Sequence, residues 1–131
     1  MEKEKILIID DDPDIVESMK IILEKDGYRV DSASNSIEGL ERFVAFRPAL
    51  IILDVMMESM DSGFSFARQL KKDQKFGKIP ILMLTAAEEK TGLNFKAEAG
   101  DKDWLPVEGF LDKPVASDVL LQTVAKLLEK S

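Results

Sequence analysis

The sequence contains neither cysteine nor histidine. The absence of cysteine excludes disulfide bonds, thiolate metal ligands and cysteine nucleophiles, and it fits a reducing compartment. The absence of histidine removes imidazole as a general base, a metal ligand or a phosphoryl carrier. Any acid–base or metal chemistry must therefore come from carboxylates, lysine, threonine or the backbone.

Long apolar runs and an excess of positive charge are also missing. The first apolar run ends after Ile9, which is too short for a signal peptide or a membrane span. The formal net charge of −7 opposes nucleic-acid binding, because that affinity depends on a basic surface. We therefore expect a cytoplasmic protein that binds neither membranes nor nucleic acid directly. With 45% apolar residues and no visible linker, residues 1–131 are predicted to form a single domain.

Short apolar runs of strand length recur along the chain. Three of them are continuous, as in strands covered on both faces: Ile6–Ile9, Leu50–Leu53 and Ile81–Leu84. Gly109–Leu111 is a shorter run of the same kind, and Tyr28–Ala33 alternates in the manner of an edge strand. The sequence therefore predicts five strands.

Amphipathic helical segments lie between these runs. Residues 13–26 have helical spacing of apolar residues, with Asp12 as the N-cap and Pro13 at the first helical position. Asn35 followed by Glu38 resembles a capping box and predicts a second helix. We expect four apolar side chains of this second helix to face the core: Ile37, Leu40, Phe43 and Val44.

Two more helices are predicted at 64–72 and 117–130. The last one carries its apolar residues at Val119, Leu120, Val124, Leu127 and Leu128, and Ser117 is its expected N-cap. Glycine and proline interrupt residues 86–107, so the helix expected there is short, displaced or absent. The element order predicts an α/β fold with a doubly wound five-stranded parallel sheet and helices on both faces.

Polar residues terminate the predicted strands: Asp10, Asp11, Asp12, Asp54, Thr85 and Lys113. Because the carboxyl ends of parallel strands meet at one edge of a sheet, we expect these side chains to lie together. One aspartate suffices to cap a helix, and two others would repel each other when ionised unless a cation offset their charge. A turn with a helix cap therefore explains part of the cluster, and a Mg²⁺ site explains more of it.

Asp54 is the residue with the most specific predicted chemistry. It could merely end a strand, but a carboxylate beside a metal ion can attack phosphorus and form an aspartyl phosphate. Lys113 offers a positive charge and Thr85 a hydroxyl donor to phosphoryl oxygens, although each also has an ordinary structural explanation. Together these residues predict an anion site around Asp54.

Four segments carry a family resemblance through their order and spacing: Ile6–Asp14, Leu53–Met57, Leu84–Ala86 and Lys113–Pro114. They resemble the receiver domain of two-component response regulators, and the resemblance covers almost the whole chain. It implies a flavodoxin-like strand order 2-1-3-4-5. It also implies a phosphorylation-dependent signalling switch that is not an enzyme, beyond catalysing its own phosphorylation and dephosphorylation.

The resemblance implies a role for each residue of the metal site. Asp54 is the expected phosphoacceptor and also a metal ligand. Asp11 is expected to bind Mg²⁺ directly, Asp10 largely through water, and Met56 through its backbone carbonyl.

The resemblance also implies how the phosphoryl group is held. Thr85 is expected to bind one phosphoryl oxygen and to move on activation, and Lys113 to pair with another, its aim set by a cis bond to Pro114. Phe110 occupies the position of the family's aromatic switch, although an ordinary core role explains it equally well. Phosphorylation would then bias a two-state surface.

The sequence departs from the family pattern in two places near this site. Residues 58–63 lack the proline usual after the acceptor and contain one extra residue, and the segment 94–107 is unusually long. That segment is either a functional surface or an insertion that Trp104 pins to the core. Met56 and Ala87 are apolar at positions that tune water access in this family, so we expect slow self-dephosphorylation.

Partners follow from the resemblance as well. We expect a stand-alone receiver, a sensor histidine kinase or phosphotransfer protein as phosphoryl donor, and a downstream protein effector. Two other classes remain open. One is a haloacid-dehalogenase-like phosphatase, whose Asp-x-Asp pattern Asp10–Asp12 formally contains; the other is a pseudo-receiver that signals only by binding. The combination of Asp54, Thr85 and Lys113 argues against both.

Overall fold

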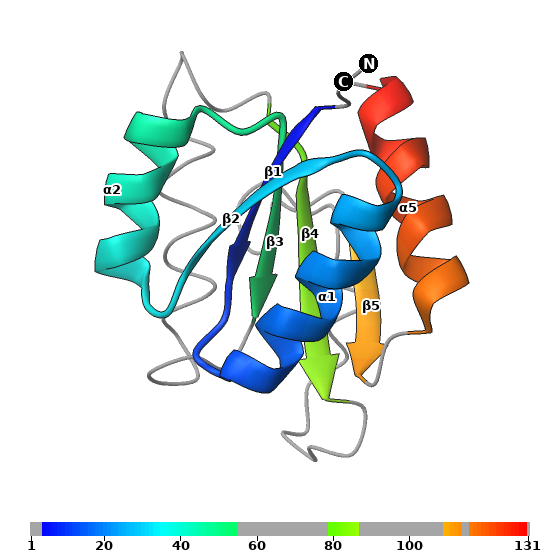
Figure 1. Cartoon of the computed structure of the whole chain (residues 1–131), viewed down its shortest axis with the longest axis horizontal. Coiled ribbons are helices and arrows are strands. Elements are labelled where there is room, and N and C mark those ends of the chain that lie inside the picture. The colour runs from blue at the N-terminus through cyan, green and yellow to red at the C-terminus, as the bar shows by residue number, and fades with distance from the viewer. Residues whose placement is uncertain (1–3, 55–78, 87–108, 114–115, 131) are drawn as a thin grey trace.

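The computed structural model describes residues 4–54, 79–86, 109–113 and 116–130. These residues contain a five-stranded parallel sheet with the strand order β2-β1-β3-β4-β5 (Figure 1). The strands are β1 (Lys5–Ile9), β2 (Arg29–Ala33), β3 (Leu50–Asp54), β4 (Ile81–Ala86) and β5 (Gly109–Lys113), and the helices are α1 (Pro13–Lys25), α2 (Ser36–Phe46) and α5 (Ser117–Lys130). The predicted fold class, strand order and edge position of β2 are confirmed.

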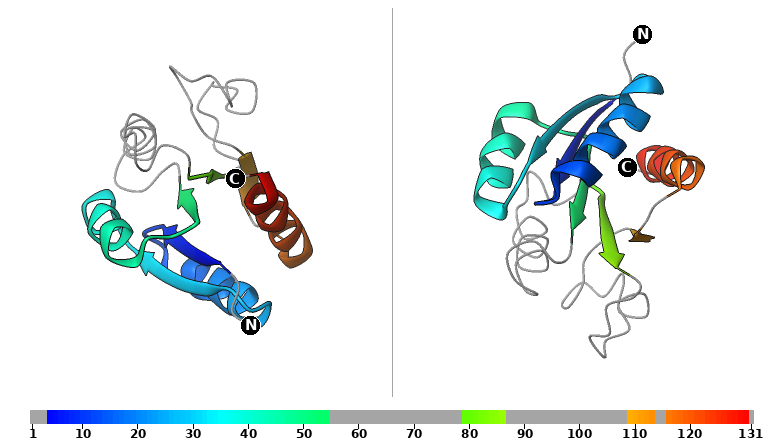
Figure 2. Two further views of the ribbon diagram at one scale, coloured as in Figure 1. Left: turned by 90° about the horizontal axis from the view of Figure 1, so that it is seen from above. Right: turned by 60° about the horizontal axis from the view of Figure 1, so that its bottom comes forward.

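The three central strands β1, β3 and β4 are apolar because both of their faces are covered. Helices α1 and α5 lie on one face of the sheet and α2 lies on the other (Figure 2). The even-numbered apolar residues of these strands pack with α1 and α5 in one cluster: Ile6, Ile8, Leu50, Ile52, Leu82 and Leu84. The odd-numbered ones, such as Leu7 and Ile51, are also fully buried, which explains why the runs do not alternate.

Helix α1 begins and packs as its sequence predicts. The Asp12 carboxylate accepts the backbone N–H groups of Asp14 at 3.0 Å and Ile15 at 3.4 Å, so it caps the helix, and proline occupies the first turn. Met19 and Leu23 are buried in the cluster beneath the helix. After the helix, the chain turns into β2 through a glycine with a positive φ of 101° at position 27.

Helix α2 presents a different face to the sheet from the one predicted. Phe43 is buried as expected, but Ile37, Leu40 and Val44 are 75%, 38% and 58% exposed. The physical reason is Gly39, where an added Cβ would stand 2.8 Å from the Cδ1 atom of Ile9. The helix therefore packs against β1 through its glycine and its phenylalanine, and the remaining apolar residues turn outward.

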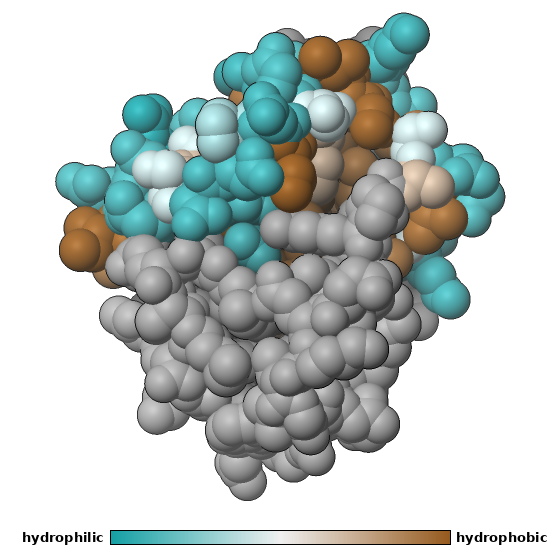
Figure 3. Space-filling model, turned by 90° about the horizontal axis from the view of Figure 1, so that it is seen from below, coloured by the Kyte–Doolittle hydropathy of each residue, from teal (hydrophilic) through white to brown (hydrophobic). Residues whose placement is uncertain are grey.

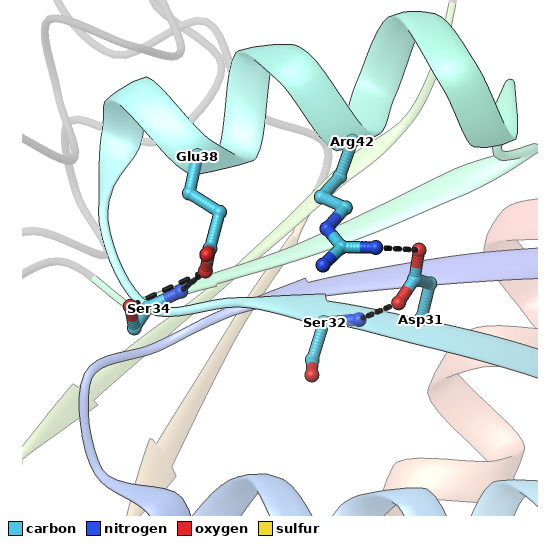
Figure 4. A network of polar contacts seen from close by, with 5 residues as sticks. All are labelled: Asp31, Ser32, Ser34, Glu38 and Arg42. Atoms are coloured by element: carbon cyan, nitrogen blue, oxygen red, sulfur yellow. Dashed lines mark hydrogen bonds and ion pairs between the residues drawn. The ribbon is translucent and has the colours of Figure 1, made fainter.

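The predicted capping box of α2 is present in modified form. Asn35 caps the helix, because its side-chain oxygen accepts the N–H of Glu38 at 2.8 Å. The Glu38 carboxylate accepts hydrogen bonds from Ser34, at 2.7 Å from its backbone N–H and 3.3 Å from its hydroxyl (Figure 4). The reciprocal bond thus goes one residue before the cap rather than to the cap itself.

Helix α5 buries Leu120, Val124 and Leu127 against the sheet, as predicted, whereas Val119 is 41% exposed. Its first turn corrects one expectation. The carbonyl of Ala116 accepts the N–H of residue 120 at 3.0 Å, so Ala116 and not Ser117 occupies the N-cap position.

Several predictions fall outside the described residues. They concern the helix predicted at 64–72, the loop 58–63 and the helix predicted to be short, displaced or absent within 86–107, including segment 94–107 with Trp104. They also concern Met56 and Ala87, and the cis bond before Pro114. Within the described part of the chain, no helix is both long and apolar enough to cross a membrane.

Candidate metal and phosphoryl site

Two buried aspartates lie side by side at the carboxyl edge of the sheet. Strands β1 and β3 are hydrogen-bonded neighbours in which Ile9 pairs with Leu53, so Asp10 and Asp54 follow at the next position of each strand. Asp10 is 2% exposed and Asp54 is 5% exposed, and they are the only buried polar or charged residues in the described part of the chain. Charged side chains are rarely buried to this degree, so two buried aspartates at one edge of the sheet are unusual.

Asp11 joins the two buried aspartates from the exposed side of the edge. One carboxylate oxygen from each of Asp10, Asp11 and Asp54 lies within 4.8 Å of the others. Oxygen donors at this spacing suit a hard divalent cation such as Mg²⁺, which takes one or two carboxylates and completes its shell with water. Three like charges held so closely repel one another, and a cation would offset that repulsion. The donor set therefore fits the predicted metal.

The consecutive aspartates in the turn after β1 have different roles. The Asp10 N–H donates to the Ala33 carbonyl at 3.0 Å, which extends the pairing of β1 with β2. One Asp10 carboxylate oxygen accepts the N–H of Asp12 at 2.9 Å, and the Asp12 side chain caps α1. The helix cap thus accounts for Asp12 alone. The cap does not explain why the Asp11 carboxylate lies close to the carboxylates of Asp10 and Asp54.

The backbone places the predicted phosphoryl-binding positions at the same edge. Asp54 pairs with Leu84, so Thr85 follows immediately in β4, and Lys113 ends β5 opposite the next residue of β4, Ala86. Phe110 pairs with a residue nearer the middle of β4. The side chains of Thr85, Phe110 and Lys113 lie outside the described part of the structure, as does Met56. Their roles stay predictions.

This edge of the sheet is the lower end of the molecule in Figure 1, toward which the strands run. Figure 3 looks directly onto it and shows hydrophilic side chains over much of the described surface at the left and centre of the view. Among the residues that the structure describes, Asp10, Asp11 and Asp54 form the only acidic group close enough to hold a metal ion. All three were identified from their positions after apolar runs, and no other aspartate or glutamate among the described residues joins the group.

Comparisons with known proteins agree with this fold. Residues 6–125 match the response regulator receiver domain family. The chain belongs to this family, and so to the phosphorylation-dependent switches of two-component signalling.

Individual relatives differ in how much of their length the chain covers. Protein PilH of Pseudomonas aeruginosa is 31% identical over 124 residues, which cover 95% of this chain and 97% of PilH. The DNA-binding dual master transcriptional regulator RpaA of Synechocystis is 36% identical over 127 residues, which cover 97% of this chain and 50% of RpaA. The chain therefore spans about half the length of RpaA and nearly all of PilH.

Solved structures support the same assignment. The chemotaxis response regulator CheY4 of Vibrio cholerae superposes with a TM-score of 0.79 at 30% identity, over 95% of this chain and 98% of CheY4. The signal receiver domain of a signal transduction histidine kinase from Syntrophus aciditrophicus gives a TM-score of 0.82 at 32% identity, over 98% of this chain and 92% of that one. Both likenesses extend over almost the whole chain.

Proposed function

We propose that this chain is a signalling switch in which Asp54 accepts a phosphoryl group in a Mg²⁺-dependent reaction. The observation that carries the proposal is the buried carboxylate of Asp54, which has an oxygen within 4.8 Å of the nearest ligand atoms of Asp10 and Asp11. Burial at the end of β3 keeps this side chain at the carboxyl edge of the sheet, where a phosphoryl donor would approach.

Asp10, Asp11 and Asp54 would hold the metal, together with the backbone carbonyl of Met56. Bound there, Mg²⁺ offsets the negative charge of the carboxylates and of the incoming phosphoryl group, which otherwise repel each other. The hydrogen bond from the Asp12 N–H fixes one oxygen of Asp10 and so orients that carboxylate within the cluster.

The transfer step joins a carboxylate oxygen of Asp54 to phosphorus while the bond from phosphorus to the donor atom breaks. With a phosphohistidine donor, the electron pair of the broken P–N bond stays on the imidazole nitrogen. Residues 1–131 contain no histidine, so the phosphohistidine would belong to a sensor histidine kinase or a phosphotransfer protein. The chain itself would catalyse only its own phosphorylation and dephosphorylation.

Thr85 and Lys113 would bind the oxygens of the transferred group. Their strand positions adjoin Asp54 at the sheet edge, which supports these roles. Movement of Thr85 toward the phosphoryl group would leave room for Phe110 to turn, and the altered surface would change affinity for a downstream protein. With a net charge of −7, this output would act on protein and not directly on nucleic acid.

Acetyl phosphate provides a direct test. We expect the intact mass of the full chain to rise by one phosphoryl group when acetyl phosphate and Mg²⁺ are both present, and Asp54→Asn to abolish the rise. Glu24→Gln, an exposed carboxylate near the distal end of α1, is the matched control and should be modified normally. A mass increase that survives Asp54→Asn would contradict the proposal.

Two further readouts separate the alternative functions. Steady phosphate release from many phosphate esters, abolished by Asp10→Asn, would indicate the phosphatase and not the switch. A chain that acquires no phosphoryl group under any condition would be a pseudo-receiver. The apolar residues Met56 and Ala87 predict slow hydrolysis of the acyl phosphate; a phosphoprotein that decays within seconds would contradict that expectation.

A further inference from the structure

One peptide group at the end of β2 links the acidic cluster to helix α2. This group joins Ala33 to Ser34, so it carries the Ala33 carbonyl on one side and the Ser34 N–H on the other. The carbonyl accepts the N–H of Asp10 at 3.0 Å, and the Ser34 N–H donates to the Glu38 carboxylate at 2.7 Å (Figure 4). Because a peptide group is planar, a carboxylate that holds its N–H also fixes the direction of its carbonyl.

The first turn of α2 holds Glu38 in position for this contact. The Glu38 N–H donates to the side-chain oxygen of Asn35 at 2.8 Å, and the Glu38 carboxylate also accepts the Ser34 hydroxyl at 3.3 Å. The next residue, Gly39, packs against the side chain of Ile9, the last residue of β1. The start of α2 is therefore fixed against both strands that lead to the acidic cluster.

Asp10 receives hydrogen bonds that hold it at two points. Its backbone N–H is bound by the Ala33 carbonyl, and one oxygen of its buried carboxylate accepts the Asp12 N–H at 2.9 Å. Groups that hydrogen-bond a metal ligand from behind orient it, and their loss typically costs about 10–100-fold in metal affinity. A hydrogen bond one step further from the metal should contribute less, but in the same direction.

We propose that Glu38 is a positioning residue for the metal site: its carboxylate holds the peptide group after Ala33 and, through that group, the backbone of Asp10. The inference rests on the proposed function, because it assigns Glu38 a role in Mg²⁺ binding by Asp10, Asp11 and Asp54. Glu38 is not one of the carboxylates that form the cluster. It acts on the site through hydrogen bonds and contributes no ligand atom.

Two substitutions of equal charge test the proposal. Glu38→Gln keeps an oxygen that can accept the Ser34 N–H, as glutamine does in capping boxes, whereas Glu38→Ala removes it. Asn35 still caps the helix in both variants, because it binds the backbone N–H of residue 38. We expect the alanine variant to bind Mg²⁺ about threefold or more weakly than the glutamine variant, by amide chemical-shift titration of the unphosphorylated full chain.

The amide hydrogen of Asp10 reports the link without any metal. It should exchange with solvent faster in Glu38→Ala than in Glu38→Gln, because its acceptor is then less firmly held. Coupling between two sites is reciprocal, so Mg²⁺ should in turn slow exchange of the Ser34 amide in the parent chain. A role of Glu38 in helix stability alone would not change the Asp10 amide selectively.

Glu41 provides the matched control, because it is exposed on the same helix and lies outside this turn. Glu41→Ala and Glu41→Gln should bind Mg²⁺ with equal affinity. Circular dichroism checks that all four variants are folded, which we expect because alanine and glutamine are both good helix formers.

The outcomes separate this proposal from the proposed function. Equal Mg²⁺ affinity of the two Glu38 variants would overturn the role of Glu38 and leave the metal site intact. The same result follows if the two Glu41 variants differ as much as the two Glu38 variants do. A parent chain that binds no Mg²⁺ would overturn both the role of Glu38 and the Mg²⁺-dependent reaction at Asp54.

Discussion

The guanidinium of Arg42 on α2 lies 3.6 Å from a carboxylate oxygen of Asp31 on the edge strand β2. The other oxygen of Asp31 accepts the backbone N–H of Ser32 at 2.8 Å. The Arg29 N–H and the Ala33 carbonyl both bond toward β1, so the alternating Ser32 N–H points to the free edge of the sheet. The Asp31 carboxylate therefore occupies the Ser32 N–H, to which a strand of another molecule could otherwise hydrogen-bond.

This arrangement predicts that Asp31→Ala increases self-association. The substitution uncovers the Ser32 N–H and removes a charge from the edge, two features that keep edge strands from pairing. Sedimentation velocity over a range of protein concentrations measures the change. Glu24→Ala removes the same charge from an exposed site on α1 and should remain monomer-like in comparison.

Substitution of Arg42, the ion-pair partner of Asp31, should have a different effect from substitution of Asp31. Arg42→Ala should cost less than about 1 kcal/mol of unfolding free energy in urea, because partly exposed ion pairs contribute little. It should not increase association, since the Asp31 carboxylate still covers the edge donor. Equal association of the Arg42 and Asp31 variants would contradict this assignment of roles.

The acidic cluster predicts selective loss of metal binding. Asp11→Asn should weaken Mg²⁺ affinity at least tenfold, because it replaces a charged ligand in a set of three. Titration of Mg²⁺ followed by amide chemical shifts measures the affinity. Asp14→Asn removes an exposed charge from the first turn of α1, outside the cluster, and should change the affinity much less. Equal losses of Mg²⁺ affinity in both variants would indicate a general effect of net charge and not a metal site at the cluster.

The α1 cap predicts a stability change separable from metal binding. Asp12→Ala should lower the unfolding free energy by about 1 kcal/mol, because it removes the acceptor for two N–H groups of the first turn. Asp12→Ser should recover most of that loss. Urea unfolding at fixed pH without Mg²⁺ measures both, and an Asp12→Ala variant as stable as the parent would show that the cap contributes nothing.

The contact of Gly39 with Ile9 predicts a compensating pair of substitutions. Gly39→Ala should destabilise the protein, since overpacking costs about 1–3 kcal/mol and better helix propensity offsets only about 1 kcal/mol of it. Ile9→Val removes the Cδ1 atom that the new methyl group meets. In that background, Gly39→Ala should be neutral or stabilising in urea unfolding. An equal loss of unfolding free energy in the parent and in the Ile9→Val background would show that the Ile9 Cδ1 atom is not the source of the strain.

Much of the fold could be predicted because it follows from short segments. Continuous apolar runs indicated strands buried on both faces, and Asp12 with Pro13 marked the start of α1. The exposed face of α2 could not be predicted in this way. Its apolar residues have ordinary helical spacing, and the close approach that turns them outward depends on Gly39 meeting Ile9, a residue far away in the chain.

The sequence by itself determined the strands and the residues that end them, because hydrophobic period and capping are local properties; the strand order was implied by the family resemblance. It also identified Asp10, Asp11 and Asp54 as a set. Only the tertiary structure decided that Asp10 and Asp54 are buried while Asp11 is exposed. Distances between carboxylates on different strands depend on register and burial, and these arise only when the sheet and its helices pack together.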